Sequence, residues 1–85
     1  MNAAQLYDTA FKNGVQLGYS AAKAFANRGL IYLVGYRRLT DGHGKWSSVH
    51  KWCKEHAGLD NYSWAGDTFA FRDPEIATMF KLRWG

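Results

Sequence analysis

The sequence predicts a small α+β protein in which a sheet of two or three strands packs against helices. Apolar residues recur at helical spacing in three segments, and they alternate or run together in two others. The segments follow one another in the order helix, strand, helix, strand, helix, and we expect the helices to cover one face of the sheet. Because the chain has 85 residues, one proline and no linker-like run, residues 1–85 are expected to form a single domain.

Residues 3–27 are expected to form the first helix. Their apolar and small side chains fit one broad helical face, and Gly29 follows as a C-terminal stop signal. Asn13-Gly14 is a strong turn dipeptide, so this helix is expected to be kinked or broken there. The alternative is a hairpin over residues 9–19, followed by a shorter helix.

The first strand is predicted over residues 29–40, where β-branched and aromatic residues form the continuous apolar run that is typical of a central strand. A glycine-rich turn over residues 41–44 leads to the second helix. That helix is expected to begin at Ser47 or Ser48 and to end near Ala57. Its apolar stripe comprises Trp46, Val49, Cys53 and Ala57.

The C-terminal part predicts a second strand over residues 62–72, either a bent strand or a hairpin around Ala65-Gly66-Asp67. A final helix follows because Asp73 is a good N-cap and Pro74 suits the first helical position. The buried face of this helix is expected to comprise Ile76, Ala77, Met79, Phe80 and Trp84.

Composition limits the classes of function. Eleven Lys and Arg against seven Asp and Glu give a formal charge of +4, which favours an acidic partner. Cys53 is the only cysteine, so no intramolecular disulfide can form, as is usual in a reducing compartment. The N-terminal residues lack the pattern of a signal peptide, and the longest apolar run is too short to cross a membrane. We therefore expect a cytoplasmic protein without a membrane partner.

The sequence offers no pattern that is typical of a metal or catalytic site. His43, His50, Cys53 and His56 form the only cluster of metal-ligand residue types, and their spacing matches no zinc motif. On a helix, two of them, His50 and His56, point about 120° apart. The seven carboxylates are scattered, and helix caps and a turn account for three of them. We therefore expect a non-enzymatic protein with no metal and no cofactor.

The segment from Phe69 to Gly85 resembles the closing segment of small uncharacterised bacteriophage proteins. In both, a Phe-x-Phe strand leads through acidic residues to an Ala-x-x-Phe-Lys-Leu-x-Trp helix, and the match covers about a fifth of this chain. The resemblance implies a phage origin and a bacterial host, and it transfers no site residues. Small phage proteins of one domain often bind a host machine and inhibit or redirect it.

Basic residues that adjoin aromatic ones indicate a binding surface, with Tyr36 and Trp52 as the expected exposed aromatics. We hypothesise that the chain binds a host or phage protein with an acidic surface and occludes that surface. The alternatives are a nucleic-acid-binding accessory protein, recognisable by a steep salt dependence, and a virion or assembly component. The oligomeric state stays open. The residues expected to bind are Arg37, Arg38, Lys51, Trp52 and Lys54.

Overall fold

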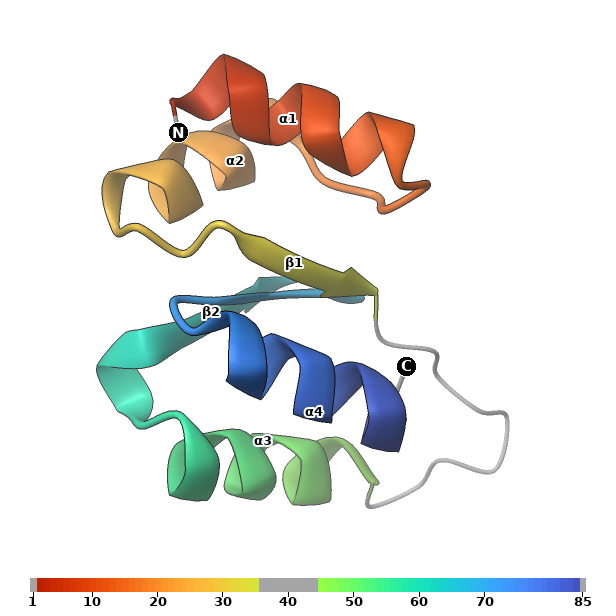
Figure 1. The fold of residues 1–85 in the computed structure, drawn as a ribbon, viewed down its shortest axis with the longest axis vertical. Coiled ribbons are helices and arrows are strands. Elements are labelled where there is room, and N and C mark those ends of the chain that lie inside the picture. Colours follow the sequence, from red (N-terminus) through yellow and green to blue (C-terminus); the bar gives the residue numbers. More distant parts are fainter. Residues whose placement is uncertain (1, 36–44, 85) are drawn as a thin grey trace.

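The computed structural model of the protein describes residues 2–35 and 45–84, with the backbone alone at residues 45 and 46. Within these residues, helices and strands follow one another in the order α1, α2, β1, α3, a short 3-10 helix, β2, β3, α4 (Figure 1). Four α-helices and a three-stranded sheet make this an α+β fold, and the predicted fold class is confirmed.

The N-terminal segment forms two helices, because the chain breaks between α1 at Ala3–Lys12 and α2 at Tyr19–Asn27. A capping box begins α1: Asn2 Oδ1 accepts from the Gln5 N–H at 2.8 Å, and Gln5 Oε1 accepts from the Asn2 N–H at 2.9 Å. Gly14 follows α1 at φ +70°, a conformation that glycine adopts at little cost. The predicted break near Gly14 is confirmed, and the alternative hairpin is wrong.

The strands form one antiparallel sheet in the order β1-β3-β2, with β1 at Tyr32–Gly35, β2 at Tyr62–Ala65 and β3 at Thr68–Phe71. β2 and β3 are joined by a tight turn in which Gly66 has a φ of +59°. The hairpin alternative for residues 62–72 is therefore confirmed.

The central strand is β3, so the expectation that residues 29–40 form a central strand is wrong. β1 lies at an edge of the sheet, and residues 36–40 lie outside the described part of the chain. The apolar run of β1 has another cause: Val34 belongs to the core on one face of the sheet, and Leu33 packs against the core on the other. An edge strand that is covered on both faces has the same continuous apolar sequence as a central strand.

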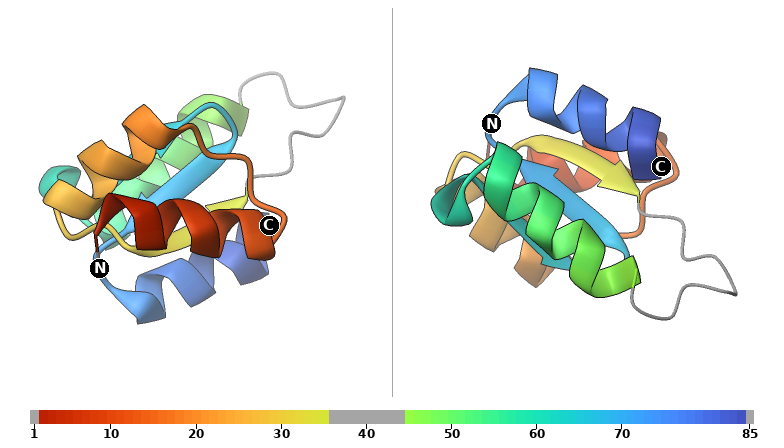
Figure 2. Two further views of the ribbon diagram at one scale, coloured as in Figure 1. Left: turned by 90° about the horizontal axis from the view of Figure 1, so that it is seen from above. Right: turned by 90° about the horizontal axis from the view of Figure 1, so that it is seen from below.

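Helices cover both faces of the sheet, and the expected one-sided arrangement is wrong (Figures 1 and 2). α1 and α2 lie on one face, while α3 at Lys45–His56 and α4 at Pro74–Trp84 lie on the other. The reason is that all four residues of β3 are buried, so each face of the strand needs cover. The core beneath α1 and α2 contains Leu6, Phe25, Leu30 and Ala70. The core beneath α3 and α4 contains Val34, Val49, Cys53, Tyr62, Phe69, Phe71, Ala77 and Phe80.

α4 begins as its sequence predicts. Asp73 Oδ1 accepts a hydrogen bond from the Glu75 N–H at 2.8 Å, and Phe80 is fully buried. Met79 is 43% exposed, so its expected place on the buried face is wrong. Met79 precedes Phe80 by one residue, so the two side chains point about 100° apart around the helix axis, which is enough to turn Met79 out of the core.

Candidate functional site

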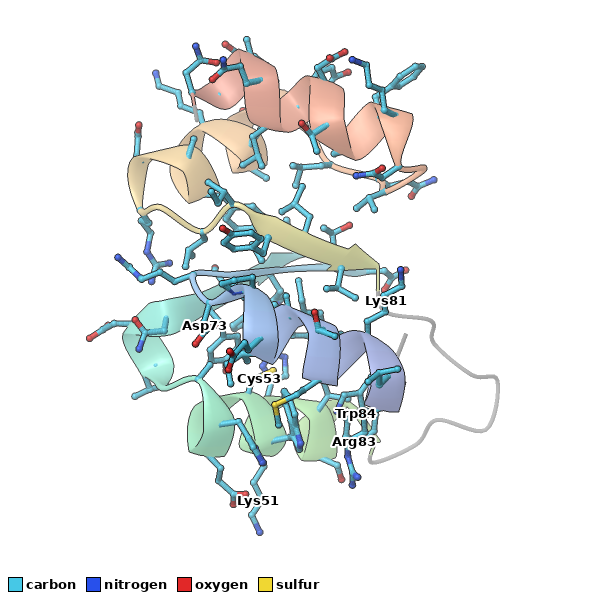
Figure 3. All side chains as sticks on the ribbon, in the orientation of Figure 1. Lys51, Cys53, Asp73, Lys81, Arg83 and Trp84 are labelled. Carbon is cyan, nitrogen blue, oxygen red and sulfur yellow. The ribbon has the colours of Figure 1, made fainter. Side chains whose placement is uncertain are left out.

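Three of the five predicted binding residues belong to the described part of the chain, and these three differ in exposure. Arg37 and Arg38 lie outside the described residues, and the other three belong to α3. Lys51 and Lys54 are exposed, whereas Trp52 is half-buried. Figure 3 shows Lys51 pointing away from the sheet, on the side of α3 opposite the core. Lys51 and Lys54, three residues apart, therefore lie on the exposed side of α3, and Trp52 turns away from that side.

Trp52 packs inward, so the expectation that it is an exposed aromatic is wrong. Its ring stacks on His56 with the centroids 4.3 Å apart, and it meets the ring of Phe80 at 6.0 Å. Trp52 thus helps to close the interface between α3 and α4. Tyr36, the other expected exposed aromatic, lies outside the described residues.

Trp64, on β2, is an exposed aromatic residue near Lys54. It lies opposite Phe69 in the sheet and is 46% exposed. The His50 ring meets the Trp64 ring edge-on, with the centroids 4.2 Å apart. Because His50 and Lys54 are one helical turn apart, α3 presents both of them on the side that faces β2.

A hollow of about 400 Å³ lies between α3 and β2, and we call it the β2 hollow. Two of its members are exposed apolar side chains: Leu59 is 67% exposed and Trp64 is 46% exposed. No carboxylate is found among its described lining residues, and Lys54 supplies a cation. The hollow thus combines apolar anchor groups with a positive charge. Its lining comprises His50, Lys54, Leu59, Tyr62 and Trp64.

The turn after α3 places Leu59 at the hollow. Gly58 reverses the chain at φ +90°, and the Asn61 Nδ2 donates to the Ala57 carbonyl at 2.8 Å. A Cβ at Gly58 would lie 3.3 Å from Asn61 Nδ2, so both conformation and space favour glycine. The short 3-10 helix Leu59–Asn61 follows and directs Leu59 toward solvent.

The electrostatics of the β2 hollow leave Lys54 as its main charge. Burial, and secondly the neighbouring Lys54, lower the pKa of His50 below its usual value, so the imidazole is neutral at neutral pH. Burial, and secondly Cys53, raise the pKa of the Tyr62 hydroxyl. His50 Nδ1 and the Tyr62 hydroxyl are 3.3 Å apart, a contact between two neutral groups.

Three of the residues that suggested metal or nucleophile chemistry, His50, Cys53 and His56, belong to the described part of the chain, and they do not converge on one point. Cys53 is fully buried, and burial raises its pKa to about 12, which keeps the thiol protonated and unreactive. His56 Nδ1 lies 2.9 Å from the Trp52 carbonyl, on the side of α3 away from His50. His43 lies outside the described residues. Among the residues that the structure describes, no three His, Cys, Asp or Glu side chains are grouped to hold a metal ion.

Sequence reasoning found Lys54 and missed Trp64 and Leu59. Trp64 shares a strand face with Tyr62, which is buried, and its own exposure depends on how far α3 extends over an edge strand. A signal for Leu59 was present, because a leucine directly after a helix-ending glycine lies in a turn and outside any apolar stripe.

Comparison of the chain with models of protein families, with curated proteins and with solved structures found no match. None of the helices in residues 2–35 and 45–84 has the length and apolar character needed to cross a membrane.

Proposed function

We propose that the protein binds another protein stoichiometrically through the β2 hollow and performs no catalysis of its own. The observation that carries this proposal is the position of two exposed apolar side chains, Leu59 and Trp64, beside Lys54. Tryptophan is enriched among the residues that dominate binding energy at protein interfaces. An exposed leucine next to it adds apolar area that a partner can remove from water.

The proposed partner carries an apolar side chain for the hollow and a carboxylate for Lys54. The net charge of +4 and the lack of a carboxylate among the described lining residues both favour an acidic partner surface. The resemblance of the C-terminal segment to phage proteins supports a phage origin. On that basis the partner is a host or phage protein in the bacterial cytoplasm, and binding inhibits it by covering its surface.

Nucleic-acid binding is the second candidate, because an exposed Trp64 beside Lys54 can stack on a base next to a phosphate contact. Leu59 favours the protein partner. Its side chain is 67% exposed, and it offers neither a stacking surface nor a charge to a nucleic acid.

The test is affinity capture of the tagged protein from bacterial lysate, with and without nuclease. Leu59→Ser removes an anchor of the hollow, and Leu82→Ser is the matched control because Leu82 is 84% exposed on α4. We expect a dominant host or phage protein that survives nuclease and is retained by Leu82→Ser. Its affinity for Leu59→Ser is expected to fall about tenfold, the effect of losing most of a leucine's burial.

Other outcomes contradict the proposal. Equal capture by the two variants excludes the β2 hollow as the binding site. A captured fraction that disappears with nuclease supports the nucleic-acid candidate. A virion or assembly role is supported if nothing specific is captured and the protein sediments well above its mass of 9.6 kDa.

A further inference from the structure

We propose a second binding site at the open edge of β1, which takes an extended acidic segment of a partner protein as a fourth strand of the sheet. The proposal is independent of the β2 hollow, which lies at the opposite edge. It rests on the direction of the backbone groups of β1, on a groove along that strand and on the charge of the groove.

A backbone hydrogen bond directly beyond the paired residues of β2 and β3 shows which way the backbone groups of β3 point. The Arg72 N–H donates to the Asn61 carbonyl at 3.1 Å, so these two residues form a bonded pair toward β2. Along an antiparallel strand, successive residues direct their backbone N–H and C=O groups alternately toward one neighbouring strand and toward the other. Phe71 and Phe69 therefore direct their N–H and C=O groups the other way, toward β1.

This alternation leaves Leu33 with its backbone groups at the open edge. Tyr32 and Val34 lie opposite Phe71 and Phe69 and bond to β3, so Leu33, between them, faces away. No turn or loop hydrogen bond joins the backbone of Leu33 to another described residue. A strand edge of this kind is a template for pairing with another extended chain.

A groove of about 490 Å³ runs along this edge, and we call it the β1 groove. On one side it is lined by Ile31 and by the first three residues of β1. On the other sides it is lined by Thr9 of α1, by Asn13 directly after α1, and by residues of α4 that include Ala77 and Lys81. Figure 1 shows β1 between α1 and α4. Four strand residues span about 13 Å, so the groove suits a short extended segment.

The walls of the groove favour a single extended segment over a second copy of this chain. Two paired strands lie about 4.8 Å apart. A second copy would bring its own α1 and α4 beside its β1, and these helices would meet the same walls. A flexible or exposed segment of a partner has no such walls and reaches the edge of β1.

The positive charge in the β1 groove favours an acidic partner segment. Lys81 is the charged residue among the described groove lining, and no ion pair joins it to another described residue. Figure 3 shows Lys81 on α4, near the C-terminal end of β1. In an added strand, the side chains opposite Tyr32 and Val34 face α4, so an Asp or Glu at such a position approaches Lys81. The alternate side chains lie beside Ile31 and Leu33 and are expected to be apolar.

The test is selection from a display library of random peptides of roughly eight residues, the length of an ordinary strand. We expect enrichment of peptides in which β-branched residues alternate with positions that include Asp or Glu. The enriched peptide, labelled with fluorescein, then becomes the probe for affinity measurements by fluorescence anisotropy.

Two substitutions at Leu33 isolate the backbone donor. Leu33→Pro removes the outward N–H without removing a bond of the β1–β3 ladder, and Leu33→Val shortens the same side chain but keeps the N–H. We expect Leu33→Pro to weaken peptide binding about tenfold or more, and Leu33→Val to change it less than about threefold. Lys81→Glu is expected to weaken it about tenfold, and Leu59→Ser to leave it unchanged.

Equal peptide affinity of Leu33→Pro and Leu33→Val overturns the proposal, as does a selection without alternating acidic peptides. A peptide-free dimer that Leu33→Pro converts to a monomer also overturns it, because a second copy then occupies the edge. If Leu33→Pro does not fold, amide NMR shifts of the wild-type protein decide. Shifts centred on Leu33 support the groove, and shifts centred on Trp64 contradict it.

Discussion

Replacing Phe80 by alanine is predicted to remove a large part of the protein's stability. Phe80 is fully buried, with its ring centroid 4.8 Å from that of Phe69 and 5.1 Å from that of Phe71. Truncating a buried phenylalanine costs about 3–5 kcal/mol, from lost burial and from the cavity left behind. A chain of 85 residues has roughly 4–13 kcal/mol of unfolding free energy in total.

Leu82→Ala is the control on the same helix. Leu82 is 84% exposed, and leucine and alanine have similar helix propensities, so a change below about 0.5 kcal/mol is expected. Urea denaturation of wild type and both variants, followed by circular dichroism and tryptophan fluorescence, gives the three unfolding free energies. Equal losses in the two variants would refute the helix orientation argued for α4, and so would a loss in Phe80→Ala below about 1 kcal/mol.

Three further predictions concern single groups. Cys53, with its pKa raised to about 12, is expected to react with iodoacetamide at neutral pH far more slowly in the native protein than in urea; equal rates contradict its burial. Asp73→Ala removes the acceptor of the Glu75 N–H and is expected to cost about 1 kcal/mol, with Asp73→Asn closer to wild type in a thermal melt. Burial lowers the pKa of His50 in the folded state below its ordinary value of 6.5. As the pH falls below 6.5, the unfolded state therefore binds more protons than the folded state does. The stability present above that pH is therefore lost below it. His50→Gln should flatten this pH dependence of the urea midpoint, and an unchanged profile contradicts the assignment.

Local sequence signals predicted the elements whose shape is set by neighbouring residues. The start of α4 follows from Asp73 and Pro74, which act within one turn of the chain. The breaks at Gly14 and Gly66 follow from backbone conformations that glycine adopts readily, with φ of +70° and +59°. Each of these features was predicted because its cause lies within a few residues.

Features that depend on contacts between distant segments could not be predicted. The strand order puts β3 in the centre, although residues 29–40 have the more apolar sequence. The direction of Trp52 depends on α4, since its ring packs on Phe80. Periodicity within α3 identifies the face of Val49 and Cys53 and does not say which flank another helix covers.

Of the candidate site, the sequence predicted the charged residue and not its apolar neighbours. Lys54 was found because basic residues lie beside aromatic ones along the second predicted helix. Its structural neighbours Leu59 and Trp64 come from a turn and an edge strand, and only the packing of α3 against β2 brings them together. A surface assembled from three elements leaves no single spacing in the sequence.

The measurement that tests the central claim most directly is the affinity of the captured partner, once purified, for wild type, Leu59→Ser and Leu82→Ser. Isothermal titration calorimetry gives both the affinity and the stoichiometry. The β2 hollow as the binding surface predicts equimolar binding that weakens about tenfold in Leu59→Ser and is unchanged in Leu82→Ser. Equal affinities for all three proteins would contradict it and would place the binding surface elsewhere on the molecule.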